Sequence, residues 1–160
     1  MGLGTGVDGQ VLTWRDAAYG WESPTVILDL INGLATDDTG IPTSIGAEYV
    51  DASTWPTSRT VSFRCVLESS SATMPTYAAE ADLYDLDDAL GGGPGVVTGS
   101  PVDNSAAIDP QAPAMVEANV TTAFAGFTGS GVFEVRLWIN ATGGGNMVTC
   151  KSAQLVVVEV

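Results

Sequence analysis

Four aspartates in the segment ADLYDLDDALGGG are the residues whose type and spacing come nearest to a chemical site: Asp82, Asp85, Asp87 and Asp88. Carboxylate oxygens gathered in this way are the ligands that calcium takes from proteins, but the spacing does not match an EF-hand loop. The alternative is the solvated end of a strand and its loop in an acidic protein. We favour the solvated loop, and we expect neither a bound metal nor a cofactor.

Other chemistry lacks its usual residues. The chain has no histidine, which removes the commonest general base, the usual serine triad and most zinc sites. It has no P-loop, and no G-x-G-x-x-G motif joins a strand to a helix. Two carboxylates suffice for glycoside hydrolysis, but among nineteen acidic residues some pair lies close by chance. We therefore expect that the protein is not an enzyme.

Aromatic side chains are the remaining candidates for an interaction site. Trp14 and Trp21 are expected to face each other across a short hairpin, because cross-strand aromatic pairs are favourable. Trp138 falls on the polar side of its strand, which favours an inter-subunit or inter-sheet contact. Exposed rings also stack on sugars, so Trp55 and Trp138 would serve a host-glycan site. The other candidates are Tyr19, Tyr49, Tyr77 and Tyr84.

The charge balance excludes two classes of partner. Nineteen acidic residues against five basic ones give a formal net charge of −14, and the basic residues form no cluster. Binding to nucleic acid needs a basic stripe that displaces counterions from phosphates, and an anionic membrane would be repelled in the same way. No run approaches the ~20 apolar residues of a membrane span, and residues 1–10 do not have the pattern of a signal peptide. We expect a soluble protein made in a cytoplasm, whose Cys65 and Cys150 are buried free thiols, an oxidative bridge being the alternative.

The elements that position these residues are expected to be short strands, because no long segment keeps a helical period. The segment 59–68 is the clearest case: Val61, Phe63, Cys65 and Leu67 alternate with more polar positions, as in a strand with one buried face. Strands are predicted at 10–14, 25–31, 46–50, 59–68, 77–85 (a short helix being the minor alternative), 96–98, 115–123, 132–140, 147–150 and 154–160. Loops are predicted at 32–44, 101–113 and 142–146.

These elements predict two units. Residues 1–24 form a glycine-rich arm with a hairpin, and residues 25–160 form an antiparallel β-sandwich of jelly-roll type, because no amphipathic helices connect the strands.

The segment GTGVDGQVLTW at residues 4–14, followed by YGWE at 19–22, resembles a hairpin found in bacteriophage fibre and other virion-appendage proteins. The rest, with VSFRCVLE, AEADLYDLDD, FEVRLWIN and SAQLVVVEV, is similar to jelly-roll domains. The resemblance implies a head-decoration, cement, head-fibre or tail-appendage protein, often trimeric, and it supplies no catalytic residues. The long repetitive shaft of such fibres is missing from this sequence, which favours a compact cap, cement protein or head fibre.

We therefore expect a structural virion protein that binds other virion proteins and self-associates as a homotrimer. The alternative is a carbohydrate-binding module of a tail fibre or tail tip.

Overall fold

A computed structural model of the chain describes residues 11–15, 18–22, 25–31, 33–73, 77–140 and 145–160, with only the backbone for the first two segments. Its described residues form β-strands and contain no helix, which confirms the all-β prediction. The strands are β1 (Val11–Arg15), β2 (Ala18–Glu22), β3 (Thr25–Asp29), β4 (Ala35–Asp37), β5 (Thr43–Asp51), β6 (Arg59–Ser69), β7 (Ala79–Asp85), β8 (Gly95–Val96), β9 (Val102–Asp103), β10 (Ala114–Asn119), β11 (Ser130–Ile139) and β12 (Val148–Glu159).

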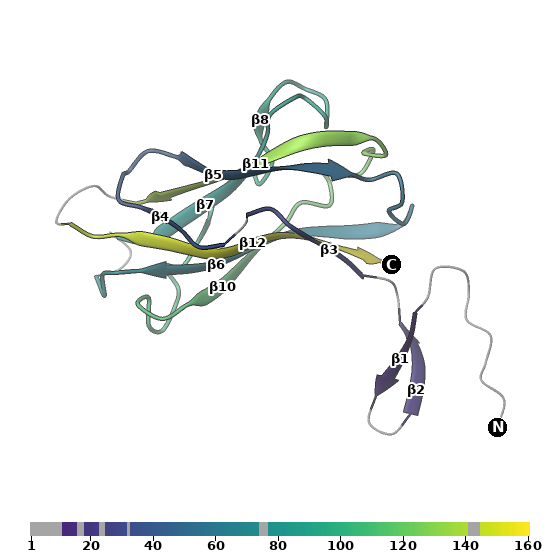
Figure 1. Cartoon of the computed structure of the whole chain (residues 1–160), viewed down its shortest axis with the longest axis horizontal. Helices are drawn as coiled ribbons and strands as arrows, with labels where there is room; N and C mark the ends of the chain where they lie inside the picture. Colours follow the sequence, from purple (N-terminus) through teal and green to yellow (C-terminus); the bar gives the residue numbers. More distant parts are fainter. Residues whose placement is uncertain (1–10, 16–17, 23–24, 32, 74–76, 141–144) are drawn as a thin grey trace.

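Two five-stranded antiparallel sheets pack face to face as a sandwich of jelly-roll type. The first has the order β10-β6-β12-β3, with β4 also paired to β12, and is called the β6–β12 sheet. The second has the order β5-β11-β7-β8, with β9 also paired to β7, and is called the β7–β11 sheet. Figure 1 shows the β7–β11 sheet as the upper layer and the β6–β12 sheet as the lower one. Strands β1 and β2 pair with each other in a separate sheet.

The core lies between the layers and follows the period-two alternation of the sequence. Val61, Phe63, Cys65 and Leu67 of β6 are almost fully buried, and their neighbours on either side are partly exposed. The inward side chains of β11, which are Phe133, Val135, Leu137 and Ile139, are buried in the same way. The alternation of the sequence predicts these inward positions in both 59–68 and 132–140, and both predictions are confirmed. Side chains of this size stabilise the fold by roughly 1.5–3 kcal/mol each when fully buried.

One end of the core is closed by four aromatic rings and an arginine. The rings of Trp55, Phe124, Phe127 and Phe133 pack with centroid separations of 5.2–6.0 Å. The Arg59 guanidinium lies 5.3 Å from the Trp55 ring centroid and donates hydrogen bonds to the carbonyl oxygens of Pro56, Phe124 and Phe127. These three hydrogen bonds from one side chain to backbone carbonyls hold the loops around Pro56 and Phe124–Phe127 against the sandwich.

The sequence predicts two separate strands at 147–150 and 154–160, whereas the structure has a single strand there. β12 runs continuously from Val148 to Glu159, with an irregularity between Cys150 and Ser152. A β-bulge inserts one residue and thereby moves the buried side chains from even to odd positions. Accordingly, Cys150 is buried before the irregularity and Ala153 is buried after it. The two thiols are free and buried on the neighbouring strands β6 and β12, and the Cys150 thiol donates a hydrogen bond to the Ser152 carbonyl oxygen at 3.2 Å.

Other boundaries are also corrected. The predicted loop 32–44 contains β4, which pairs with β12, and the predicted loop 101–113 contains β9. The predicted strand 115–123 ends at Asn119, because the Asn119 side chain accepts a hydrogen bond from the backbone N–H of Thr121 and turns the chain. Segment 77–85 forms strand β7 rather than the minor helical alternative. Residues 1–10 and 141–144 of the predicted lead-in and loop lie outside the described residues.

The hairpin register places Trp14 and Trp21 at diagonal positions across the two strands rather than directly opposite each other. Arg15 is opposite Ala18, so Trp14 is opposite Tyr19 and Trp21 is opposite Leu12. Pairing of Arg15 with Ala18 fixes this register along the hairpin, whatever aromatic pairing the sequence would favour. The side chains of Trp14 and Trp21 lie outside the part of the chain whose side chains are described.

Candidate functional site

The aspartate cluster builds a loop, and its members are divided between the core and the surface. Both carboxylate oxygens of Asp85 accept hydrogen bonds from the backbone, one from Ala89 N at 3.1 Å and the other from Leu90 N at 2.9 Å. The carboxylate of Asp87 accepts from Val132 N, at 3.1 Å, and that of Asp88 accepts from Gly93 N, at 2.6 Å. These carboxylates replace the ladder partners that the backbone loses after β7 ends.

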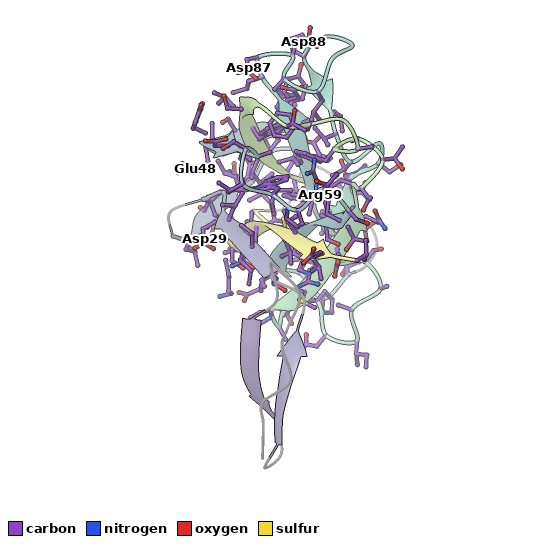
Figure 2. All side chains as sticks on the ribbon, turned by 90° about the vertical axis from the view of Figure 1, so that its right-hand side faces the viewer. Asp29, Glu48, Arg59, Asp87 and Asp88 are labelled. Atoms are coloured by element: carbon purple, nitrogen blue, oxygen red, sulfur yellow. The ribbon has the colours of Figure 1, made fainter. Side chains whose placement is uncertain are left out.

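The same loop folds back over the beginning of β11. A Cβ atom added to Gly131 would lie 2.1 Å from the Cβ of Ala89 and 3.1 Å from an Asp87 oxygen. Asp88 has a φ of +62°, and Gly91, Gly92 and Gly93 also have positive φ. The three glycines of ALGGG are therefore needed for the conformation of the loop, because glycine adopts positive φ without strain. In Figure 2, Asp87 and Asp88 lie together at one tip of the sandwich.

No metal centre is formed by this cluster. Within the described ranges, no group of three or more Asp, Glu, Cys or His side chains is arranged to hold a metal ion. A small open pocket of about 190 Å³ is lined by Asp85, Leu90 and the glycine-rich segment, but the two Asp85 oxygens are already engaged by backbone N–H groups. The prediction of a solvated loop is wrong for two members, because Asp82 and Asp85 are only 5% and 3% exposed.

Asp82 belongs instead to a buried charge group on the outer surface of the β7–β11 sheet. Arg136 lies opposite Asp82 in the register, and its guanidinium contacts Glu134 at 3.2 Å and lies 3.4 Å from the Tyr84 ring centroid. Oδ1 of Asp82 is buried, and among the described residues it has no hydrogen-bond partner. Burial raises the pKa of Asp82, Arg136 opposes this, and Glu134 adds to it. Arg136 is thus the basic residue that faces both Asp82 and Glu134.

Trp138 also lies on the outer surface of the β7–β11 sheet, and its side chain is buried there. It is outside the core cluster, as its position in the alternation predicts, but it is only 9% exposed. It lies opposite Glu80 in the register of β11 and β7. Burial raises the pKa of Glu80, the Trp138 side chain lowers it, and Asp103 raises it. Trp55 is also buried, at 7% exposure, so neither tryptophan presents a ring for sugar stacking.

An exposed apolar patch lies at the other end of this outer surface. Tyr49, Leu86 and Val96 are 65%, 38% and 48% exposed. Val132 joins them: it is opposite Tyr49 in the register, and its carbonyl accepts a hydrogen bond from Leu86 N. Tyr84 is opposite Val96. We call these five residues the apolar patch: Tyr49, Tyr84, Leu86, Val96 and Val132.

Acidic residues border the apolar patch. Asp51, Asp87 and Asp88 are exposed at its edge, and Glu134 lies in the next row of β11. We call the outer surface of the β7–β11 sheet, together with residues 86–88, the acidic face. Tyr49 and Tyr84 were candidates from the sequence, whereas Leu86 and Val96 were missed because each stands beside turn residues without a strand-like alternation.

The outer surface of the β6–β12 sheet, called the paired face, is organised differently. Arg64 binds Glu117 at 3.0 Å, and Lys151 binds Glu68 at 3.0 Å. Gln154 donates a hydrogen bond to Asp29 at 2.8 Å. Ile27 and Met115 stand at opposite edges of this face and are 56% and 67% exposed.

Comparisons with known proteins place the fold. No protein-family model matches the chain, and no curated protein does. The VP2 subviral particle of infectious bursal disease virus aligns with a TM-score of 0.50 and 12% identity, over 93% of this chain and 37% of the viral one. A T=1 particle derived from the same virus gives a TM-score of 0.49 at 12% identity, covering 98% of this chain and 40% of that one.

A xylan-binding module, CBM15, aligns with a TM-score of 0.43 and 9% identity, over 86% of this chain and 97% of the module. This chain spans only 37–40% of the length of the two viral capsid proteins described above. At these identities the likeness establishes the architecture alone: this chain has the β-sandwich of jelly-roll type that those capsid proteins contain.

Proposed function

We propose that this chain is a non-enzymatic structural component of a bacteriophage particle, where it decorates or cements the capsid or forms a short head fibre. The observation that carries the proposal is the pair of outer faces, each of which exposes large apolar side chains on a sheet. Exposed apolar groups surrounded by polar ones are typical of protein–protein interfaces. The shared architecture with viral capsid proteins supports a role in particle assembly.

Self-association is assigned to the paired face. Its charges are of both signs, because Arg64 and Lys151 stand among Asp29, Glu68 and Glu117. Because these charges are paired within the chain, a second copy can bury Ile27 and Met115 without bringing an unpaired charge against this face. We expect a homotrimer.

The arm of residues 1–24 is assigned to a neighbouring virion protein. Its described part is a two-stranded sheet of β1 and β2, and an isolated two-stranded hairpin is marginally stable in water. Packing against a neighbouring protein would supply the missing stability.

Light scattering coupled to size exclusion tests self-association. We expect the full chain to elute at three times its mass of 16.4 kDa, and we expect Met115→Glu to elute as a monomer. The matched control is Ile108→Glu, which adds the same charge at a fully exposed loop position and should remain trimeric. Deleting residues 1–24 should also leave the trimer intact. A monomeric full chain would remove self-association from the proposal.

Immunogold labelling tests the particle assignment. An antiserum against the recombinant chain should label gradient-purified particles from lysates in which the gene is expressed, and the label should be lost from particles of a virus deleted for the gene. Absence of the chain from the purified particles would overturn the assignment to a virion.

A further inference from the structure

The acidic face has an excess of negative charge that the chain itself does not balance. Arg136 is the one basic residue among its described positions, and it already contacts Glu134 and Tyr84. Glu80, Asp82 and Glu134 lie in its central rows. Asp51, Asp87 and Asp88 are exposed around the apolar patch. An apolar centre with a charged border is the anatomy of an interface, and here the three exposed border residues are all acidic.

Every basic side chain that the structure describes is already engaged elsewhere. Arg59 is held by three backbone carbonyls, Arg64 by Glu117 and Lys151 by Glu68. A second copy of the chain therefore has no unengaged cation, within the described side chains, to place against Asp51, Asp87 or Asp88. Two acidic faces brought together would repel each other, because like charges in an interface cost free energy.

We propose that the acidic face, at the apolar patch, docks a basic surface of a different protein that also presents apolar side chains. This inference rests on the proposed function, since it names the class of partner through which a virion component would be attached. Apolar side chains of the partner cover Tyr49, Leu86 and Val96, and its lysines or arginines lie against Asp51, Asp87 and Asp88. The charges steer the encounter, and burial of the patch supplies most of the affinity.

Three synthetic peptides serve as probes. The first alternates lysine with tyrosine, the second replaces each lysine with glutamate, and the third replaces each tyrosine with serine. Calorimetry on the full chain measures affinity, and hydrogen exchange read by mass spectrometry locates the protected segments. We expect the lysine–tyrosine peptide to bind best and to protect β5, β11 and residues 86–88. Binding should weaken as salt is added.

Two variants separate docking from general attraction between opposite charges. Tyr49→Ser should weaken binding of the lysine–tyrosine peptide by about fivefold or more, as expected for a central contact residue. Ile108→Ser removes an exposed apolar side chain from a loop outside both faces and should leave the affinity unchanged. Equal affinity of the lysine–serine peptide, protection spread over other acidic segments, or an unaffected Tyr49→Ser variant would overturn the proposal.

The remaining outcomes are also decisive. If β5 and residues 86–88 become protected with rising protein concentration in the absence of peptide, a second copy occupies the face, and the proposal is overturned. If the lysine–tyrosine peptide docks as expected but the antiserum does not label particles, the acidic face is a docking surface and the assignment to a virion fails. Failure of the two ideas can therefore be distinguished.

Discussion

The paired face and the acidic face are built on the same antiparallel pattern, yet they differ in how charge is balanced. On the paired face, Arg64 and Lys151 each bind a glutamate at 3.0 Å. On the acidic face, Arg136 contacts Glu134 at 3.2 Å and lies opposite Asp82, whose Oδ1 has no partner within the described residues. The paired face is electrostatically self-sufficient, whereas the acidic face needs a complement from outside the chain.

The pKa shifts express this difference. Hydrogen bonds from Ser62 and Arg64 hold the pKa of Glu117 below its ordinary value. Burial raises the pKa of Asp82 in spite of Arg136. Ionisation of Glu117 therefore stabilises the fold, and ionisation of Asp82 opposes it. Asp82 and Glu117 should therefore respond in opposite directions to the same removal of charge.

The largest effect is expected from Gly131→Ala, which attacks the loop that supports the acidic face. The new methyl group would overlap the Cβ of Ala89, 2.1 Å away, and overpacking of this kind costs roughly 1–3 kcal/mol. We expect urea denaturation to show a loss of about 2 kcal/mol and hydrogen exchange to rise over residues 86–93. Gly129→Ala is the control, because its added Cβ meets no atom within 4 Å. Equal losses in both variants would show that the close approach at Gly131 has no influence on stability.

An intermediate effect of the opposite sign is expected from Asp82→Asn. The folded-state pKa of Asp82 is raised, so its contribution to stability is full in acid and is lost as pH rises through that pKa. Asparagine does not ionise, and near neutral pH the variant should gain about 1 kcal/mol, the scale of a buried polar group left without a partner.

This gain should disappear in acid, where both side chains are neutral, and denaturation at several pH values measures it. The exposed Asp38→Asn variant is the control and should change little. A loss of stability near neutral pH in Asp82→Asn would mean that attraction to Arg136 outweighs burial.

The smallest effect is expected from Glu117→Gln on the paired face. Both side chains of the Arg64–Glu117 pair are 36% exposed, so solvent screening limits the loss to about 0.5 kcal/mol. The contribution of Glu117 is present above the ordinary glutamate pKa of 4.5 and is lost as pH falls through its lowered pKa. A double-mutant cycle with Arg64→Gln measures the coupling. A stabilising Glu117→Gln would remove the contrast between the faces.

The strands were predictable where one period continued without interruption. β6 alternates in burial from Val61 to Ser69, and the predicted inward residues of β11 are buried, although the outward Glu134 and Trp138 are buried there too. Prediction failed where a single residue changed the register or the chain turned early. The bulge in β12 and the turn after Asn119 are examples, since both depend on local hydrogen bonds that alternation does not describe.

The candidate site was predicted less well than the fold. Asp82 and Asp85 were expected on wet surfaces from their types and neighbours, and both are buried. Trp138 was expected on the polar side of its strand, in a contact, and it is 9% exposed. Burial of an outer-face residue depends on which strands and loops lie beside it, and these neighbours are distant in the sequence. Arg136 covers Tyr84, and the loop that Asp85 holds packs on Gly131.

By itself, the sequence determined that this protein is all-β, that it is strongly acidic and that its core comes from alternating strands. These properties depend on composition and on a period of two, which are local. Only the tertiary structure decided which acids share Arg136, and that Tyr49, Leu86 and Val96 form one patch. Strand pairing brings residues together across long separations, and the balance of charge on each face follows from that pairing.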